Sequence, residues 1–179
     1  MLHLSSRKKS LDQNELKNYR PVSNLSFVPK IIEKLVLSQL SDHLSANNLY
    51  NRFQSAYRPR HSTETALLKT VNDLLLALDD GNVSLLALLD LSTAFDTTDH
   101  GILLHRLHHD FGTQGTALDW FSSYLTNRTQ YVSIHCYTSE PAPISFGVPQ
   151  GSVLGPVLFV LYTAPLSTLI EKHSVLHHS

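Results

Sequence analysis

Apolar residues recur at every third or fourth position in two long stretches, and this spacing predicts two amphipathic helices. The first begins near Pro29, which a first helical turn tolerates, and ends at Asn47. The second begins at Ser62, an N-capping residue, carries Glu64 where the helix dipole favours an acid, and ends at Gly81. We expect the first helix to pack on a core through Ile32, Leu35, Val36, Leu40 and Leu44, and the second to run through the apolar positions Ala66, Leu67, Val71, Leu74, Leu75 and Leu78.

An uninterrupted apolar run at residues 83–89 is too short for a helix and predicts a central strand buried on both faces. Two helices are expected next, at 102–111 and 117–125, followed by a strand at 130–137 whose pairing Pro141 and Pro143 break. A long apolar helix is then expected from Ser152 to about Ile170, bent or interrupted near Pro156 and Pro165. This order of elements predicts an α+β domain.

The N-terminal residues lack sustained periodicity, so we expect residues 1–17 to form a flexible lead-in to one domain at 18–179. Residues 18–25 have the composition of a turn-rich entry into the first helix. A chain of 179 residues with 42% hydrophobic and 16% charged residues is long enough for one ordinary core.

Charge and cysteine content narrow the class of protein further. A net charge of −1 lacks the basic excess of a free-standing nucleic-acid binder, so we expect weak binding to nucleic acid by this piece alone. The single cysteine, Cys136, favours a reducing compartment. The apolar runs are too short or interrupted to span a membrane, and no signal peptide precedes them. We therefore expect an intracellular protein, cytoplasmic or nuclear, that is not secreted.

Two groups of side chains have the residue types of metal ligands. Asp90 follows the predicted buried strand, which would fix a carboxylate for a divalent cation, although Asp at a strand end also commonly caps a turn. The spacing alone leaves both interpretations open. His105 and His109 stand four apart on a predicted helix, near His100 and His108, but a solvated helix face is favoured there over a metal site.

Four segments of the chain, at residues 18–25, 53–58 with 62–65, 88–100 and 147–156, together resemble the reverse transcriptase of non-LTR (LINE-type) retrotransposons. Residues 88–100 (LLDLSTAFDTTDH) are similar to the first palm motif of that family, and residues 147–156 (GVPQGSVLGP) to the second. Residues 53–58 (FQSAYR) with 62–65 (STET) resemble the fingers motif, and residues 18–25 the block that precedes the fingers. The resemblance implies the fingers and partial palm of a right-hand polymerase, with the thumb absent.

The resemblance also implies roles for single residues. Asp90 would be the catalytic, metal-binding carboxylate, and Phe95 the gate that excludes a ribose 2′-hydroxyl. Gln150, Gly151 and Leu91 would contact the nucleotide. Arg58, with Arg60 as second choice, would hold the triphosphate, since a guanidinium can pair bidentately with phosphate oxygens. Asp96 and Asp99 follow the family pattern without being its metal ligands, and we expect them to make local hydrogen bonds.

By the same resemblance, the parent enzyme would extend a DNA primer on an RNA template with dNTPs and two Mg²⁺ ions. Its third palm motif, an aromatic residue followed by Ala-Asp-Asp, supplies two of the three metal-binding carboxylates and does not occur in this sequence. We therefore expect a fragment truncated before that motif, inactive alone, which lacks the rest of the palm and the thumb. Whether the full-length element also contains an endonuclease domain is left open. The alternative is a non-catalytic nucleic-acid-binding or interaction remnant of a decayed element.

Overall fold

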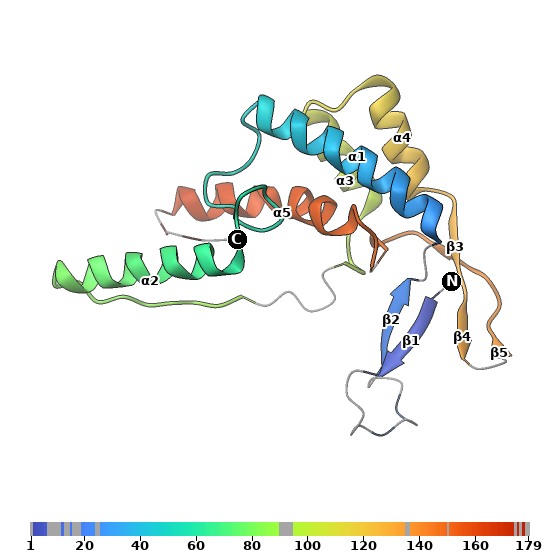
Figure 1. Cartoon of the computed structure of the whole chain (residues 1–179), viewed down its shortest axis with the longest axis horizontal. Helices are drawn as coiled ribbons and strands as arrows, with labels where there is room; N and C mark the ends of the chain where they lie inside the picture. The colour runs from blue at the N-terminus through green and yellow to red at the C-terminus, as the bar shows by residue number, and fades with distance from the viewer. Residues whose placement is uncertain are drawn as a thin grey trace.

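The computed structural model describes residues 2–6, 12, 15, 19–23, 26–89, 95–134, 137–149, 151–173, 175 and 177 (Figure 1). Three of the site residues predicted above, Asp90, Leu91 and Gln150, lie outside these ranges, and so does Cys136. In the part that is described, no helix is both long and apolar enough to cross a membrane.

Four helices pack together and form what we call the helical body: α1 (Phe27–Ala46), α3 (His100–His109), α4 (Gly115–Leu125) and α5 (Gly155–Lys172) (Figure 1). Each of the four has leucines or phenylalanines on one side, as the apolar spacing predicted. Those side chains, together with Val148 of the second motif, make one core: Leu40, Leu44, Leu103, Leu107, Phe111, Phe121, Leu125, Val148, Leu154, Val157, Leu158 and Leu161.

The ends of these helices follow from local chemistry. Helix α1 ends at the predicted asparagines, and Asn48 takes a φ of 53°, a conformation that asparagine tolerates. Helix α5 begins at Gly155, three residues later than predicted. The Gly155 N–H donates to the Ser152 hydroxyl at 2.8 Å. The predicted interruption is wrong: Pro156 lies in the first turn, where its missing N–H needs no partner, and the helix continues past Pro165.

Helix α2 (Thr63–Asp79) forms as predicted but lies apart from the helical body (Figure 1). Ser62 and Thr65 make a reciprocal capping box, and Gly81 follows the helix with a φ of 74°. None of its residues is buried, and Leu68 is 71% exposed. Among the described residues, this helix therefore contributes no side chain to the core.

The strand predicted at residues 83–89 is not present. These residues have no regular secondary structure, and their side chains are exposed, from Val83 at 100% to Leu86 at 52%. An apolar strand needs neighbours that pair its backbone and cover both faces, and no described strand lies beside this segment. Hydrophobic composition alone therefore did not produce a central strand.

The strands form two small sheets instead. The larger has the order β2-β1-β4-β5, from β1 (Leu2–Ser6), β2 (Tyr19–Ser23), β4 (Val132–Ile134) and β5 (Tyr137–Thr138). Strand β1 pairs antiparallel with β2 and parallel with β4, and β4 pairs antiparallel with β5. A strand thus occupies Leu2–Ser6 within the expected flexible lead-in, and another lies in the expected turn-rich segment; the domain boundary at residue 18 stays a prediction.

The single strand predicted at 130–137 is divided among β3 (Arg128–Gln130), β4 and β5, because β4 and β5 pair with each other as a hairpin. Strand β3 pairs antiparallel with β6 (Ala142–Ile144), and Thr129 stands opposite Pro143. The expectation that Pro143 breaks pairing is wrong, since a two-stranded sheet has an outer edge on each strand where no N–H is required.

Candidate functional site

The two palm-like motifs lie against each other in the structure. Residues 95–100 of the first and 147–148 of the second are joined by backbone hydrogen bonds from Val148 N–H to the Phe95 carbonyl and from Gly147 N–H to the Thr98 carbonyl, both at 2.7 Å. Asp99 and Phe146 add an antiparallel bridge. We call residues 95–100 and 146–148 the motif junction. The arrangement brings together two segments that are about fifty residues apart in sequence.

His100, the first residue of α3, adds a side-chain hydrogen bond to the motif junction. The imidazole is 7% exposed, and its Nε2 lies 2.7 Å from the carbonyl oxygen of Gly147, to which the ring N–H donates. A neutral imidazole with its proton on Nε2 satisfies this carbonyl. Asp99, the preceding residue, caps α3, since its Oδ1 accepts from the Ile102 N–H at 2.9 Å. Local hydrogen bonding was the role predicted for Asp99, and it is confirmed.

Gly147 is required by this close approach. Its φ is +89°, and a Cβ at this position would lie 2.9 Å from the Phe95 carbonyl oxygen and 3.1 Å from the Asp96 Cα. Both neighbours are backbone atoms and cannot move aside as a flexible side chain would. The glycine that opens the second motif therefore has a packing reason, independent of any contact with a nucleotide.

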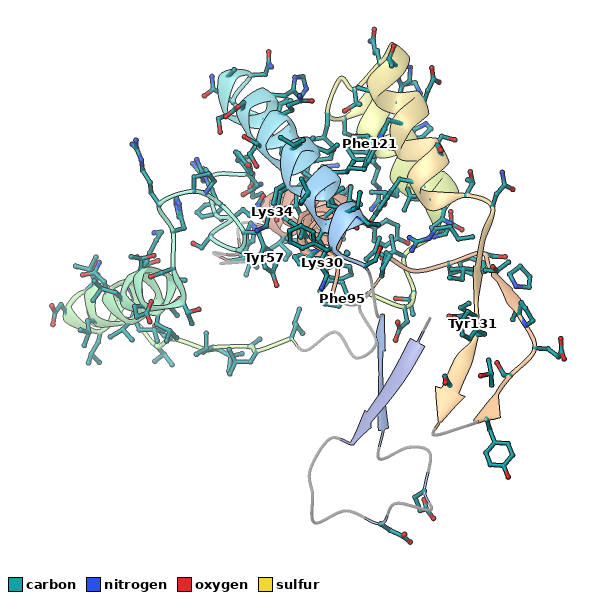
Figure 2. The ribbon with its side chains drawn as sticks, turned by 45° about the vertical axis from the view of Figure 1, so that its right-hand side comes forward. Lys30, Lys34, Tyr57, Phe95, Phe121 and Tyr131 are labelled. Carbon is teal, nitrogen blue, oxygen red and sulfur yellow. The ribbon has the colours of Figure 1, made fainter. Side chains whose placement is uncertain are left out.

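Phe95 lies at the edge of the helical body, whereas Phe121 lies inside it (Figure 2). The Phe95 ring is half-buried and packs on the Phe159 ring of α5, with ring centroids 5.4 Å apart and a tilt of 54°. Gly151, the other described residue predicted to contact the nucleotide in this region, is exposed with a φ of +93°.

Residues 50–61, which include the fingers-like segment 53–58, form a loop that is hydrogen-bonded to the helical body. Asn51 donates from Nδ2 to Glu171 Oε1 near the end of α5 at 3.1 Å. Two residues of the loop, Tyr57 and Arg60, have positive φ values of 53° and 66°. Such conformations are uncommon for residues other than glycine and each costs roughly 1–3 kcal/mol, so surrounding contacts must hold the loop in shape.

The two arginines predicted to hold phosphate differ in their surroundings. Arg58 is half-buried, with NH1 3.3 Å from the Asn51 carbonyl oxygen and its guanidinium 5.3 Å above the centre of the Tyr50 ring. Arg60 is exposed and has no hydrogen-bond or ion-pair partner within the described residues. A guanidinium has five N–H donors, so Arg58 retains donors for a ligand while it also braces the loop.

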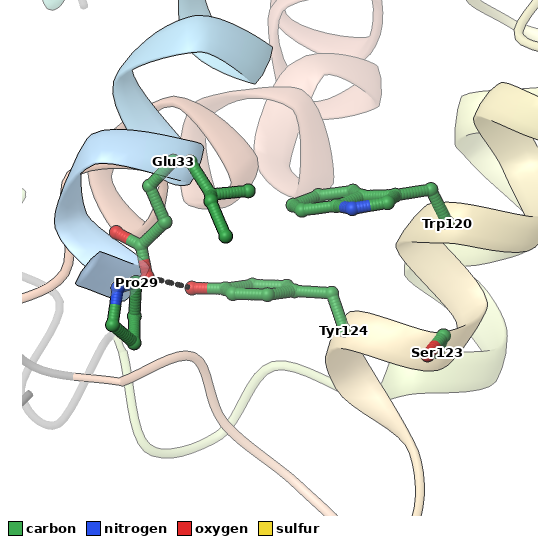
Figure 3. A pocket seen from close by; sticks show the side chains of 6 residues that line it. Pro29, Glu33, Trp120, Ser123 and Tyr124 are labelled. Carbon is green, nitrogen blue, oxygen red and sulfur yellow. Dashed lines mark hydrogen bonds between the residues drawn. The ribbon is translucent and has the colours of Figure 1, made fainter.

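A buried carboxylate on α1 joins three helices (Figure 3). Glu33 is 2% exposed; its Oε1 accepts from the Tyr124 hydroxyl of α4 at 3.0 Å, and its Oε2 accepts from the N–H of Val153 at 2.5 Å and of Leu154 at 3.4 Å. The last two groups precede α5, so Glu33 caps that helix from outside. Burial, and next the Glu33 carboxylate, raise the pKa of the Tyr124 hydroxyl.

The histidines on α3 do not act as one group. His105 and His109 are exposed, with ring centroids 4.2 Å apart, as expected for a solvated helix face, whereas His100 is buried in the motif junction. Across the described ranges, no three His, Cys, Asp or Glu side chains are placed to hold a metal ion. Because Asp90 lies outside those ranges, its role as a metal ligand stays a prediction.

Sequence reasoning missed Glu33 and the structural role of His100. A signal for Glu33 was present, because it stands on the same helical stripe as Leu37, Leu40 and Leu44, where a carboxylate is unexpected. No comparable signal existed for His100. Its partner is a backbone carbonyl 47 positions away, which the residue type does not encode.

Comparison with known proteins agrees with this arrangement. A profile of the family described as "Reverse transcriptase (RNA-dependent DNA polymerase)" matches residues 6–179. The chain is 35% identical over 154 residues to "RNA-directed DNA polymerase from mobile element jockey" of Drosophila melanogaster, covering 86% of this chain and 17% of the relative. It is 32% identical to "Probable RNA-directed DNA polymerase from transposon BS" of the same organism, covering 83% of this chain and 16% of that protein.

A vertebrate relative extends the match. The chain is 34% identical over 178 residues to "Transposon TX1 uncharacterized 149 kDa protein" of Xenopus laevis, covering 94% of this chain and 13% of the relative. The chain thus spans less than a fifth of the length of these three relatives. With the family profile matching nearly every residue and two motifs joined in space, the chain belongs to the reverse transcriptase family.

Proposed function

We propose that this chain is a fragment of an RNA-directed DNA polymerase of a non-LTR retrotransposon, which extends a DNA primer on an RNA template with dNTPs. The observation that carries the proposal is the motif junction, where the first and second motifs are hydrogen-bonded to each other. Asp90 and Gln150 adjoin these two segments in the sequence, five positions before Phe95 and two positions after Val148.

In this proposal one side chain is catalytic and the others bind the nucleotide. Asp90 is the catalytic carboxylate, and Phe95 lies against the sugar, where its ring leaves no room for a 2′-hydroxyl. Gln150, Gly151 and Leu91 contact the nucleotide. Arg60, which is exposed, and Arg58, which keeps unused donors, bind the triphosphate oxygens. Fingers at the N-terminal side and a partial palm around the junction are the corresponding regions, with the thumb outside this chain.

Magnesium would bring the primer hydroxyl and the triphosphate together and neutralise developing charge. The described residues do not assemble a set of ligands for it, so the proposal for Mg²⁺ rests on Asp90 and the family alone. Since a single carboxylate is a poor site for Mg²⁺, we infer that the other two come from a segment with the aromatic-Ala-Asp-Asp motif, which this sequence lacks.

We further propose that the 179 residues alone do not polymerise DNA. Residues 83–89, which lead to Asp90, are exposed and belong to no strand, so the segment that should hold the catalytic carboxylate is not braced by a sheet. A reactive group needs placement to within a fraction of an ångström for efficient catalysis.

The full protein would act where RNA templates and DNA targets occur, in the cytoplasm or the nucleus.

Primer extension tests the catalytic part of this proposal. The purified chain is given a DNA primer on an RNA template, dNTPs and Mg²⁺, beside an Asp90→Asn variant and an Asp96→Asn variant that removes an exposed acid from the same motif. We expect no extension above background in any sample. Extension by the wild type and by Asp96→Asn, lost in Asp90→Asn, would disprove inactivity of the isolated chain and establish the role of Asp90.

Binding measurements test the nucleotide site separately. Equilibrium dialysis with labelled dTTP and Mg²⁺ should show binding that Arg60→Ala and Arg58→Ala each weaken by about threefold or more, since charge-assisted contacts to phosphate are lost. Arg52→Ala, outside the fingers motif, is the matched control. Absence of dTTP binding combined with salt-dependent RNA binding would instead favour the non-catalytic remnant, which the net charge of −1 makes a weak binder at best.

A further inference from the structure

A cavity of about 220 Å³ lies between the N-terminal part of α1 and the middle of α4 (Figure 3). It is separate from residues 95–100 and from the fingers-like loop, and no role proposed above uses it. Its lining combines apolar, aromatic and acidic side chains: Pro29, Ile32, Glu33, Trp120, Ser123 and Tyr124.

The aromatic wall is ordered by stacking. Trp120 and Tyr124 stand one turn apart on α4, and their rings are stacked with centroids 5.2 Å apart and an angle of 10° between their planes. Arg128 lies over the Tyr124 ring at 5.4 Å. Both aromatic rings point across the cavity toward α1, so ring edges line this side of the cavity, opposite Pro29 (Figure 3).

Glu33, the acidic residue that lines the cavity, has an unused hydrogen-bond acceptor position. A carboxylate offers about four lone pairs. The Glu33 carboxylate uses three: one on Oε1 for Tyr124 and two on Oε2 for Val153 and Leu154. All three donors are neutral, and no described cation pairs with this carboxylate, which is 2% exposed. The start of α5 compensates part of this charge, and the remaining lone pair favours a positively charged donor over a neutral one.

We propose that this cavity binds a planar organic cation of the amidine or guanidine class, about the size of one aromatic ring. The N–H groups of the cation donate to the free lone pair of Glu33 Oε1, and its apolar ring packs against the edges of the Trp120 and Tyr124 rings. The cavity is smaller than the roughly 300 Å³ at which sites for drug-sized ligands begin, which restricts the ligand to a single ring or a side-chain terminus.

The proposal goes beyond polymerase activity and does not depend on it. Ligand in this cavity would contact Glu33, whose other oxygen holds the residues just after the Pro-Gln-Gly turn of the second motif. A bound ligand would therefore change the hydrogen bonds that Glu33 makes with Val153 and Leu154. Binding itself requires neither Asp90 nor a nucleotide.

Fluorescence of Trp120, the sole tryptophan of the chain, reports on the cavity directly. The full chain is titrated with benzamidine and with benzamide, a neutral molecule of almost the same shape. We expect saturable quenching or a spectral shift by benzamidine at submillimolar to millimolar concentrations, and a response to benzamide at least tenfold weaker. Equal responses to both molecules, or a response without saturation, would overturn the proposal. This comparison uses the unaltered chain and is independent of the folding of any variant.

Variants locate the site. Glu33→Gln should weaken benzamidine binding at least tenfold, while Asp42→Asn, which removes an exposed carboxylate from the same helix, should leave it unchanged. Ile32→Phe enlarges a cavity-lining side chain that is 44% exposed and should also abolish binding. Unchanged affinity in both Glu33→Gln and Ile32→Phe would exclude this cavity as the site.

The same titration distinguishes two sources of the ligand. N-acetylarginine amide presents the guanidinium as it occurs on a protein partner, whereas benzamidine represents a free aromatic cation. Binding of the arginine derivative at comparable concentration assigns the cavity to a partner's arginine, and selective binding of benzamidine assigns it to a small molecule. Failure of both cations to bind contradicts the proposal.

Discussion

The helical body and α2 have similarly leucine-rich sequences but opposite surroundings. In the body, Leu103, Leu107 and Leu158 are fully buried, whereas the leucines of α2 are mostly exposed and none is buried. Both regions show the helical spacing of apolar residues, and both form helices at the predicted places. The difference shows that apolar spacing decides where a helix forms but not whether it finds a surface to pack on.

Polar contacts make a second difference between the two regions. The body contains long-range hydrogen bonds that fix helices against one another, from Tyr124 to Glu33, from His43 to the Phe111 carbonyl and from His100 to the Gly147 carbonyl. The side-chain hydrogen bonds that characterise α2 are local ones, within four residues. Side-chain contacts that select one neighbour are therefore what distinguishes the packed helices from the isolated one.

The largest predicted effect is on the free energy of unfolding when a core leucine of the helical body is shortened. Shortening a leucine of α2 should have almost no effect. Leu158→Ala should lower the free energy of unfolding by about 3 kcal/mol, because it leaves a cavity at a fully buried position. Leu75→Ala, 55% exposed on α2, should change it by less than about 0.5 kcal/mol. Urea unfolding followed through Trp120 measures both. Equal losses would mean that α2 packs on the body in solution.

The next effect compares two glycines with positive φ. Gly147→Ala should cost about 2–3 kcal/mol of unfolding free energy, because it adds backbone strain and brings a Cβ to 2.9 Å from the Phe95 carbonyl oxygen. Gly81→Ala at the end of α2 has a similar φ but open space around it, and should cost about 1 kcal/mol or less. The same urea titration shows which of the two variants loses more unfolding free energy. A smaller loss in Gly147→Ala than in Gly81→Ala would argue against a rigid motif junction.

A pH effect should also be confined to the body. Burial and the neighbouring Glu33 raise the pKa of Tyr124 above the value near 10 that it has in the unfolded chain. The stabilisation linked to this shift is complete below about pH 10 and is lost as the pH rises toward the folded-state pKa. Tyr124→Phe should flatten the decline in stability above pH 10, measured by urea titrations at stepped pH. An unchanged slope would assign the alkaline sensitivity to other tyrosines.

The smallest effect concerns α2 alone. Ser62→Ala removes the capping hydroxyl and should cost this helix about 1 kcal/mol, visible as lower helix content by circular dichroism while the unfolding midpoint followed by Trp120 stays in place. The Ser62 side chain also lowers the pKa of Glu64, so the variant should return that pKa toward its ordinary value in an NMR titration. Ser38→Ala, at an exposed position within α1, is a control outside the cap.

The sequence was sufficient for features that depend on neighbouring residues. The N-cap at Ser62, the asparagines that end α1 and the local hydrogen bonding of Asp99 all depend on short-range chemistry, and all are observed. The order of helices followed for the same reason. The motifs themselves could be recognised because each is contiguous, whereas the hydrogen bonds between them join distant residues that spacing along the chain does not bring together.

Features that depend on distant partners could not be predicted in this way. Residues 83–89 have the composition of a buried strand, yet burial requires neighbours that composition does not specify. Pro143 was expected to exclude pairing, but its effect depended on which edge of β6 met β3. Asp90 and Gln150, where the chemistry is expected, lie outside the described residues, so their geometry stays a prediction.

The exposed segment 83–89 also has a consequence for the behaviour of this protein at high concentration. It contains seven uncharged residues, rich in leucine and without proline, which have no regular secondary structure and which no described strand covers. Such a segment is a template for strand-by-strand association between molecules. Light scattering should therefore rise steeply with protein concentration, and Leu86→Lys should suppress it. Colloidal stability of this chain would then be governed by a few residues that contribute nothing to its core.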